Sequence, residues 1–152
     1  GRPIQLTLLA DKDYILLIVN IHAAHQNQNF GRYLGKLQLD NEEYSIEMVR
    51  IIEEKINKFL NGVDKDIDRI IILGDFNEFY RNSDKYSFLI DVKTNLYTMT
   101  TDKNKIISCC YPKDYHVPCD YIFDSKDKVS LKIDNKRQPA SDHYPVKTQL
   151  NL

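Results

Sequence analysis

The chain has 152 residues, of which 42% are hydrophobic, so one domain with its own core is expected. Its 21 basic and 22 acidic residues give a net charge of -1, which neither demands nor excludes a nucleic-acid partner, because a basic patch can be local. The sequence shows no apolar run of the ~18 residues that a transmembrane helix needs and no signal-peptide pattern, so an intracellular protein is favoured.

The first part of the chain predicts an antiparallel hairpin followed by a helix. Residues 4–9 alternate, with Ile4, Leu6 and Leu8 on one face, and residues 14–21 are nearly all apolar. Both segments therefore predict strands, which can pair through a turn at 11–13. Residues 23–39 predict a loop with room for a short helix, and apolar residues at helical spacing predict a helix over 41–61.

The apolar run at 70–73 is typical of a strand buried on both faces, and with the preceding helix it predicts a helix layer on a sheet. The run ends at Gly74, and Asp75 and Asn77 follow. On an extended chain their spacing places both side chains on the same side, where they can reach a metal, a water or a phosphate. Asp and Asn also favour turns, so a plain turn is the alternative.

The second part of the chain predicts shorter elements. We expect a short helix at 83–89 and a hairpin of strands 96–100 and 105–109 around a turn at 101–104. A loop at 111–118 precedes a strand at 120–123. An edge strand at 129–133 and a final strand at 146–150 complete the chain, with no internal repeat or domain linker.

The cysteines Cys109, Cys110 and Cys119 are odd in number and include an adjacent pair, which does not predict a disulfide framework. With His116 they could form a zinc site, but the usual paired knuckle spacing is absent. We therefore expect reduced, partly buried thiols.

Four short blocks carry the functional signal: Asn20-Ile21-His22, Gly74-Asp75-Phe76-Asn77, Cys119-Asp120-Tyr121-Ile122 and Ser141-Asp142-His143-Tyr144-Pro145-Val146. In order and interval they resemble the endonuclease/exonuclease/phosphatase family. This family includes deoxyribonuclease-like nucleases, abasic-site endonucleases, sphingomyelinases, inositol polyphosphate 5-phosphatases and deadenylases. Each block alone is a weak signal, but four in order across nearly the whole chain form a specific one.

The resemblance implies an α/β (α+β) fold, a two-sheet β-sandwich with outer helices in four layers. Residues 1–152 are similar to the C-terminal part of that domain. The family's N-terminal strands, with an Asn and a metal-binding Glu, have no match because the chain begins at Gly1 without a Met. A missing N-terminal segment or a partner chain is expected to supply them. Alone, the 152-residue chain is expected to be weakly active or inactive and prone to association.

The family's chemistry suggests catalytic roles for four residues. Asp75 orients or deprotonates the attacking water, and Asn77 donates a hydrogen bond to a phosphoryl oxygen. The resemblance implies that Asp120 pairs with His143, which favours an imidazolium facing the phosphate. A loop with local hydrogen bonds is the alternative around His143.

The resemblance also implies contacts with metal and phosphate. Asp142 is the expected ligand of Mg²⁺ or Mn²⁺, because carboxylate oxygens suit hard cations. His22 is the fifth expected catalytic residue, acting as a phosphate contact, although without the motif it would count as a surface residue. Arg2 matches a phosphate-contacting Arg of the nuclease branches more loosely.

The resulting hypothesis is a Mg²⁺-dependent phosphoester hydrolase, most simply a phosphodiesterase that cleaves nucleic acid. One alternative is a phosphomonoesterase acting on a phosphoinositide or another small phosphoester, because His22-Ala23-Ala24-His25 is faintly similar to the inositol phosphatase block. The other is an inactive half-domain or binding module, since the metal-binding Glu is absent.

Overall fold

The computed structural model describes residues 4–23, 41–77, 87–92, 95–100, 108–109, 119–126, 129, 131–134 and 141–150. The predictions for residues 24–40, 101–107 and 111–118, and for Arg2, lie outside these residues. No helix in the described part of the chain is long and apolar enough to cross a membrane.

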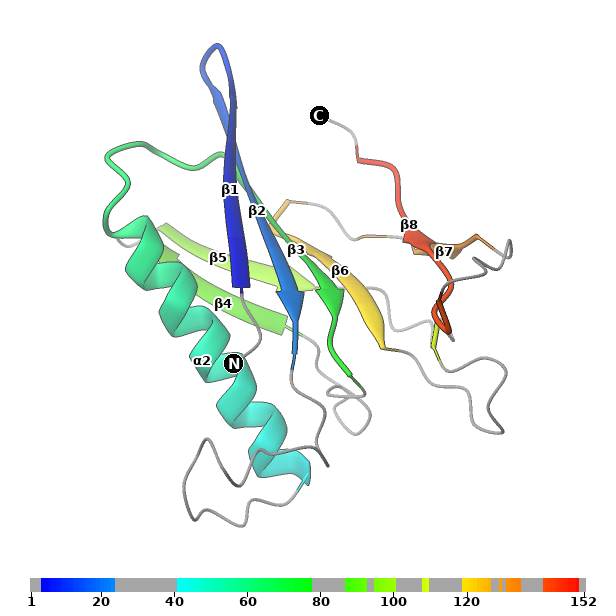
Figure 1. The fold of residues 1–152 in the computed structure, drawn as a ribbon. Helices are drawn as coiled ribbons and strands as arrows, with labels where there is room; N and C mark the ends of the chain where they lie inside the picture. The colour runs from blue at the N-terminus through cyan, green and yellow to red at the C-terminus, as the bar shows by residue number, and fades with distance from the viewer. Residues whose placement is uncertain are drawn as a thin grey trace.

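Most strands form one mixed sheet, which helix α2 (Asn41–Leu60) covers on one face (Figure 1). In the described residues the sheet has six strands in the order β1-β2-β3-β6-β5-β4. Their bounds are β1 Ile4–Asp11, β2 Tyr14–His22, β3 Arg69–Asp75, β4 Ser87–Val92, β5 Asn95–Thr100 and β6 Asp120–Asp124. A small second sheet pairs β7 (Lys132–Ile133) with β8 (Val146–Lys147). The mixed strands and the helix layer have the form of part of a β-sandwich, as expected.

The hairpin predicted at the start of the chain is confirmed. β1 and β2 pair antiparallel from Ile4 with Ile21 to Asp11 with Tyr14. Lys12 has a φ of 51°, the left-handed conformation of a tight turn. Ile4, Leu6 and Leu8 pack against the core, so their face of β1 lies toward α2.

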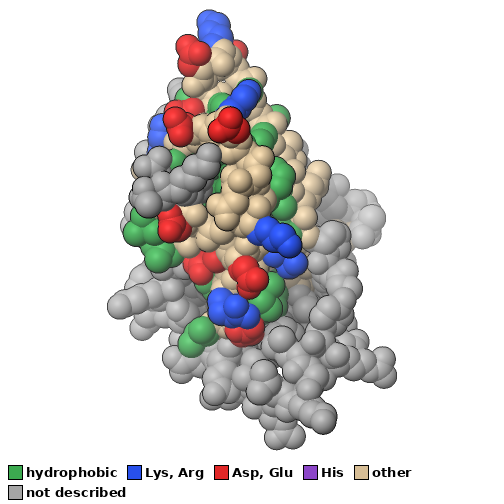
Figure 2. Space-filling model, turned by 90° about the vertical axis from the view of Figure 1, so that its left-hand side faces the viewer, with side chains coloured by type: hydrophobic (Ala, Val, Ile, Leu, Met, Phe, Trp, Pro, Cys, Tyr) green, Lys and Arg blue, Asp and Glu red, His purple; other side chains and the backbone are tan. Residues whose placement is uncertain are grey.

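Helix α2 connects β2 to β3, which run parallel side by side. The parallel arrangement requires a crossover, and α2 supplies it by packing Ile52, Ile56 and Leu60 into the core. Its outer face carries Arg50 between Glu47 and Glu54. Figure 2 shows acidic and basic side chains interspersed on this side of the molecule, so the described residues gather no basic patch there.

β3 is central, with β2 on one side and β6 on the other. Residues 69–72 are buried, which confirms the two-sided burial predicted from the apolar run. Gly74 has a φ of 139°, and a Cβ at this position would lie 1.9 Å from the carbonyl oxygen of Ile21. Glycine is therefore required where β3 passes closest to β2, one residue before Asp75.

One predicted element in the second part of the chain is wrong where the structure describes it. Residues 87–92 form strand β4, where a helix was expected to end at 89. Phe88 and Ile90 are buried and Leu89 is exposed, which is the two-residue alternation of a half-buried strand. β5 pairs with β4 along its length and with β6 at Thr100, so β4 is its hairpin partner in the described residues, while most of the predicted partner 105–109 lies outside them.

The last predicted strands are shorter than expected. The strands span Lys132–Ile133 within the segment 129–133, where Val129 forms an isolated bridge and residue 130 is outside the described part, and Val146–Lys147 within the segment 146–150. Alternation along the sequence predicts which residues share a face, but it does not show whether a partner strand is there to pair with them. Strands at sheet edges are often kept short, so alternation overestimates their length.

The face of the sheet opposite α2 is partly closed by a buried ion pair. Arg69 and Asp124 are 1% and 2% exposed and join the start of β3 to the end of β6. Arg69 Nε donates to Asp124 Oδ1 at 2.9 Å, and the Lys126 amide donates to the same oxygen at 2.9 Å. Toward the sheet edges the same face exposes Leu9, Leu89 and Leu96.

Cys119 is a buried thiol, but Cys109 is disulfide-bonded, which corrects the expectation that both are reduced. An odd cysteine count excludes complete pairing but still permits a single disulfide bond.

Candidate active site

Three polar side chains stand in register at one end of the sheet, where β2 and β3 end and β6 begins. His22 on β2 pairs with Asp75 on β3, and Asp75 pairs with Asp120 on β6. Residues in register point to the same face of a sheet. The buried side chains that flank them along each strand face α2, so all three lie on the opposite face.

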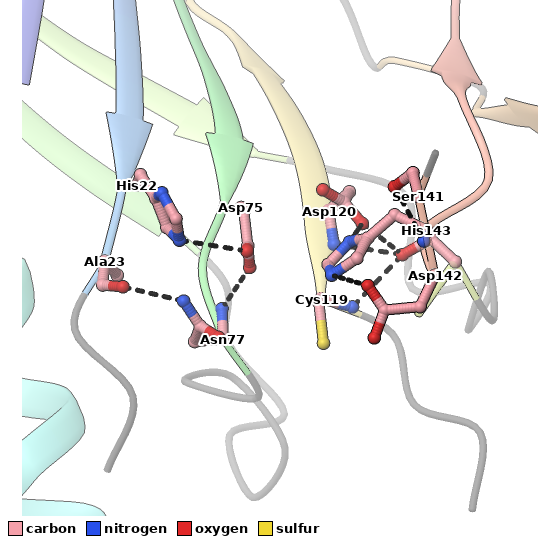
Figure 3. Close-up of polar contacts among 10 residues, drawn as sticks. His22, Ala23, Asp75, Asn77, Cys119, Asp120, Ser141, Asp142 and His143 are labelled. Carbon is pink, nitrogen blue, oxygen red and sulfur yellow. Dashed lines mark hydrogen bonds and ion pairs between the residues drawn. The ribbon is translucent and has the colours of Figure 1, made fainter. Parts of the chain in front are cut away.

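The first group of polar contacts surrounds Asp75 (Figure 3). His22 Nε2 lies 3.3 Å from Asp75 Oδ2, and the backbone amide of Asn77 donates to Asp75 Oδ1 at 2.8 Å. Asn77 has a φ of 50°, so the chain turns here and does not stay extended as assumed from the spacing. The backbone therefore forms the turn that was the alternative prediction for residues 75–77. Within this turn, the hydrogen bond from the Asn77 amide holds the Asp75 carboxylate in place.

The side chain of Asn77 also has a structural partner. Its Nδ2 donates to the carbonyl oxygen of Ala23 at 2.7 Å and so connects the segment after β3 to the end of β2. Because an amide nitrogen carries two hydrogens, this contact is compatible with a second hydrogen bond to a substrate oxygen.

The second group joins β6 to the segment before β8. His143 Nδ1 lies 2.9 Å from Asp120 Oδ2, within the hydrogen-bond range predicted for this pair. The hydroxyl of Ser141 accepts from the backbone amide of His143 at 3.0 Å and so orders the turn that carries the imidazole. Asp142 Oδ1 lies 4.0 Å from His143 Nε2, and its side chain is 46% exposed (Figure 3).

Ser108 is part of this site although the motifs do not include it. Its Oγ donates to Asp120 Oδ2 at 2.7 Å, and it is fully buried. A signal was present in the sequence, since Ser108 is the one polar residue in the apolar run at 106–110. A polar residue in a buried segment needs a hydrogen-bond partner, and that partner is often functional.

Two groups have pKa values displaced from the ordinary range. Burial raises the pKa of the Asp75 carboxyl above 3.8, and the charge of Asp120 acts in the same direction, against the hydrogen bond from Asn77. The hydrogen bond to Asp120 raises the pKa of the His143 imidazole above 6.5, although burial opposes it. A carboxylate with a raised pKa on β3 and an imidazole with a raised pKa, held by Asp120 of the neighbouring strand β6, therefore lie at the same end of the sheet.

A cavity of about 350 Å³ adjoins the second group. Asp120 and His143 lie in its lining, while Leu73, Ile122 and Val146 form apolar walls. A hydrophobic pocket with few polar groups is the usual form of a ligand site, because the polar groups set the orientation of what binds.

The described residues do not complete a metal site. No group of three or more His, Cys, Asp or Glu side chains is placed to hold an ion, either among the site residues or around Cys109 and Cys119. Asp142 offers a carboxylate with solvent access, which fits Mg²⁺ as one ligand among waters and phosphate oxygens. A single carboxylate is too few protein ligands for a resident metal, so an ion bound at Asp142 would need further ligands from outside the described residues.

The structure brings together six of the seven residues singled out from the sequence. His22, Asp75 and Asn77 form one contact group, and Asp120, Asp142 and His143 form the other. The Asp75–Asp120 register joins the two groups. Arg2 lies outside the described residues.

Solved structures of other proteins have this fold. A beta toxin from Staphylococcus aureus matches with a TM-score of 0.55 and 15% identity, over 99% of this chain and 57% of the toxin. A mutant beta toxin with bound magnesium ions gives 0.54 and 16%, over 97% and 57% of the two chains. An endonuclease/exonuclease/phosphatase family protein from Leptotrichia buccalis gives 0.50 and 17%, over 98% and 54%.

The chain therefore has the fold of the endonuclease/exonuclease/phosphatase structures, as the four motifs predicted. It spans little more than half of each solved chain, 57% of the beta toxin and 54% of the Leptotrichia protein. No protein-family model and no curated protein matches the sequence.

Proposed function

We propose that this chain carries the catalytic residues of a metal-dependent phosphoester hydrolase, and that its substrate is a nucleic acid. The observation that carries the proposal is the placement of the Asp120–His143 pair beside Asp75, on adjacent strands at one end of the sheet. The fold supports it, since the structures with this fold include a protein named for endonuclease, exonuclease and phosphatase members.

In this proposal Asp75 is the general base. Burial raises its pKa, which makes the carboxylate a better proton acceptor for an attacking water. The turn to Asn77 and the contact with His22 hold the carboxylate in place. The remaining hydrogen of the Asn77 amide then points to a phosphoryl oxygen, and His22, with its side chain 54% exposed, is accessible to a phosphate.

His143 stabilises charge on the opposite side of the phosphate. Asp120 orients the ring through Nδ1, which leaves Nε2 as the donor to a phosphoryl or leaving-group oxygen. The hydrogen bond to Asp120 raises the pKa of His143, which favours the imidazolium form that can stabilise negative charge on the phosphate.

Asp142 is the residue that would bind Mg²⁺ or Mn²⁺. When bound, the metal supplies Lewis-acid polarisation of a phosphoryl oxygen. The mutant beta toxin structure with magnesium is consistent with a metal in this fold. The second candidate function, a half-domain that binds without catalysis, is favoured by the incomplete ligand set of the described residues.

A paired assay separates the candidates. The 152-residue chain and a longer form that supplies the rest of the sandwich are incubated with supercoiled plasmid, single-stranded RNA and a phosphoinositide, with Mg²⁺ or with chelator. We expect Mg²⁺-dependent cleavage of nucleic acid that is stronger in the longer form and absent after His143→Ala. Phosphate release from the lipid alone would reassign the substrate, and inactivity of both forms would favour the binding module.

A further inference from the structure

Ser108 forms hydrogen bonds to two other segments of the candidate site. It is fully buried and connects three segments that are far apart in the sequence. Its hydroxyl contacts β6 and the residue before it, while its carbonyl contacts the segment that carries His143. None of the catalytic roles proposed for Asp75, Asn77 and His143 involves Ser108.

The hydrogen-bond pattern fixes the direction in which the hydroxyl donates. Ser108 Oγ lies 3.2 Å from the backbone nitrogen of Cys119 and 3.1 Å from that of Asp120. Backbone amides only donate, so both must use the lone pairs of Oγ. The hydroxyl hydrogen is left for the third neighbour, Asp120 Oδ2, at 2.7 Å. The full hydrogen-bonding capacity of a serine is therefore used.

Asp120 Oδ2 is also the atom that contacts His143 Nδ1 at 2.9 Å. One oxygen thus accepts from the serine and the imidazole together, which sets the rotation of the carboxylate. Without Ser108 Oγ, the amides of Cys119 and Asp120 would lose their acceptor. Asp120 Oδ2 would at the same time lose one of its two donors, and the carboxylate would be freer to rotate away from His143.

The backbone of Ser108 acts on the other partner of the pair. Its carbonyl oxygen accepts from the amide of Tyr144 at 2.7 Å, one residue after His143. The same residue therefore anchors the carboxylate through its side chain and the histidine segment through its main chain.

We propose that Ser108 is a positioning residue, which aligns the Asp120 carboxylate with the His143 imidazole by holding both segments at once. The kinetic consequence rests on the proposed hydrolase function, but the alignment itself does not. A misalignment of about 1 Å at a catalytic group lowers rates on the order of 100-fold, so the serine matters although it touches no substrate.

The alignment is tested by the signal of the hydrogen on His143 Nδ1. A solvent-shielded imidazole hydrogen bonded to a carboxylate gives a far-downfield proton resonance, observed with ¹⁵N-labelled histidine and assigned by its loss in His143→Phe. We expect this signal in the unchanged chain and in Ser108→Thr, which keeps the hydroxyl. It should disappear in Ser108→Ala and broaden in Ser108→Cys, which keeps the volume but donates weakly.

Ser125→Ala is the matched control. Ser125 Oγ accepts from the backbone amide of Ile70 at 2.8 Å, so its loss removes a similar serine contact at the other end of the sheet. We expect Ser125→Ala to lower stability but keep the His143 signal and kcat. In the longer form that supplies the rest of the sandwich, Ser108→Ala should lower kcat on the order of 100-fold with little change in KM.

Persistence of the signal in folded Ser108→Ala, or an unbroadened signal in Ser108→Cys if the alanine variant does not fold, would overturn the proposal. An equal fall of kcat in Ser125→Ala would also do so, because it would trace the effect to stability. The signal is read without substrate, so a chain without hydrolase activity still decides the question, and failure of the proposed function is seen separately.

Discussion

Asp75 and Asp120 are cross-strand partners at the ends of β3 and β6, and each carboxylate contacts a different histidine. Two carboxylates on neighbouring strands repel, and the charge of Asp120 contributes to the raised pKa of Asp75. The environments differ, because Asp120 accepts from the buried hydroxyl of Ser108 besides contacting its histidine, whereas Asp75 accepts from the backbone amide of Asn77. This asymmetry motivates separate predictions for the two carboxylates.

Asp75→Asn should remove activity without destabilising the fold. Folding raises the pKa of the Asp75 carboxyl above 3.8, so the protonated carboxyl stabilises the folded state at pH values below 3.8. This stabilisation is lost as the pH rises through the pKa that Asp75 has in the folded state. At neutral pH the ionised carboxylate therefore costs stability. We expect the variant to match or exceed the free energy of unfolding of the unchanged chain at pH 7, while kcat falls about 10²–10⁴-fold. Urea unfolding and a single-turnover assay measure both, and marked destabilisation would contradict the assignment.

Asp120→Asn should lower the pKa of His143, because the hydrogen bond to Asp120 is the main cause of its increase. A raised histidine pKa stabilises the folded state below 6.5, and the contribution is lost as pH rises through the folded pKa. As the pH rises from acidic to alkaline, the free energy of unfolding of the unchanged chain should therefore fall by more than that of Asp120→Asn. NMR titration of His143 checks the pKa and urea unfolding checks the stability. Identical pH dependence in both proteins would remove Asp120 as the cause.

Asp142→Asn should weaken Mg²⁺ binding and leave the fold intact. The side chain is 46% exposed, so its replacement disturbs little packing, while the amide removes the charge that a hard cation needs. Isothermal titration calorimetry with Mg²⁺ on the active form measures the affinity. Asp91→Asn, at an exposed position on β4, is the control. Equal Mg²⁺ affinity in Asp142→Asn and the unchanged protein would reject Asp142 as a ligand.

Asp124→Asn should destabilise the fold by about 3–5 kcal/mol, because it leaves the buried Arg69 charge without a carboxylate. The exposed pair of Lys147 and Asp134, 3.4 Å apart, is the comparison, and Asp134→Asn should cost about 0–1 kcal/mol. Urea unfolding of both variants gives the difference. Similar losses in the two variants would show that burial does not control the strength of the Arg69–Asp124 interaction.

The 152-residue chain should self-associate through the face of the sheet opposite α2. Leu89 and Leu96 are 50% and 59% exposed on the adjacent strands β4 and β5, which end the sheet on that side. Exposed apolar side chains on an edge favour association. Sedimentation velocity over a range of concentrations should show it, and Leu89→Lys with Leu96→Lys should reduce it. A monomer at every concentration would contradict this prediction.

Local patterns in the sequence determined several features because each depends on residues close along the chain. Alternation in residues 4–9, the apolar run at 70–73 and helical spacing over 41–61 predicted β1, β3 and α2. The four motifs also predicted the fold, and they identified the residues that the structure places at one end of the sheet.

Only the tertiary structure decided how those residues meet. The Asp75–Asp120 register depends on pairing between strands that are far apart in the sequence, and so does the contact of the Asn77 side chain with the carbonyl oxygen of Ala23. Ser108 enters the site because burial brings it beside Asp120, which no local pattern encodes. β4 was mistaken for a helix for the same physical reason: a short apolar segment takes the structure that its neighbours in the sheet stabilise.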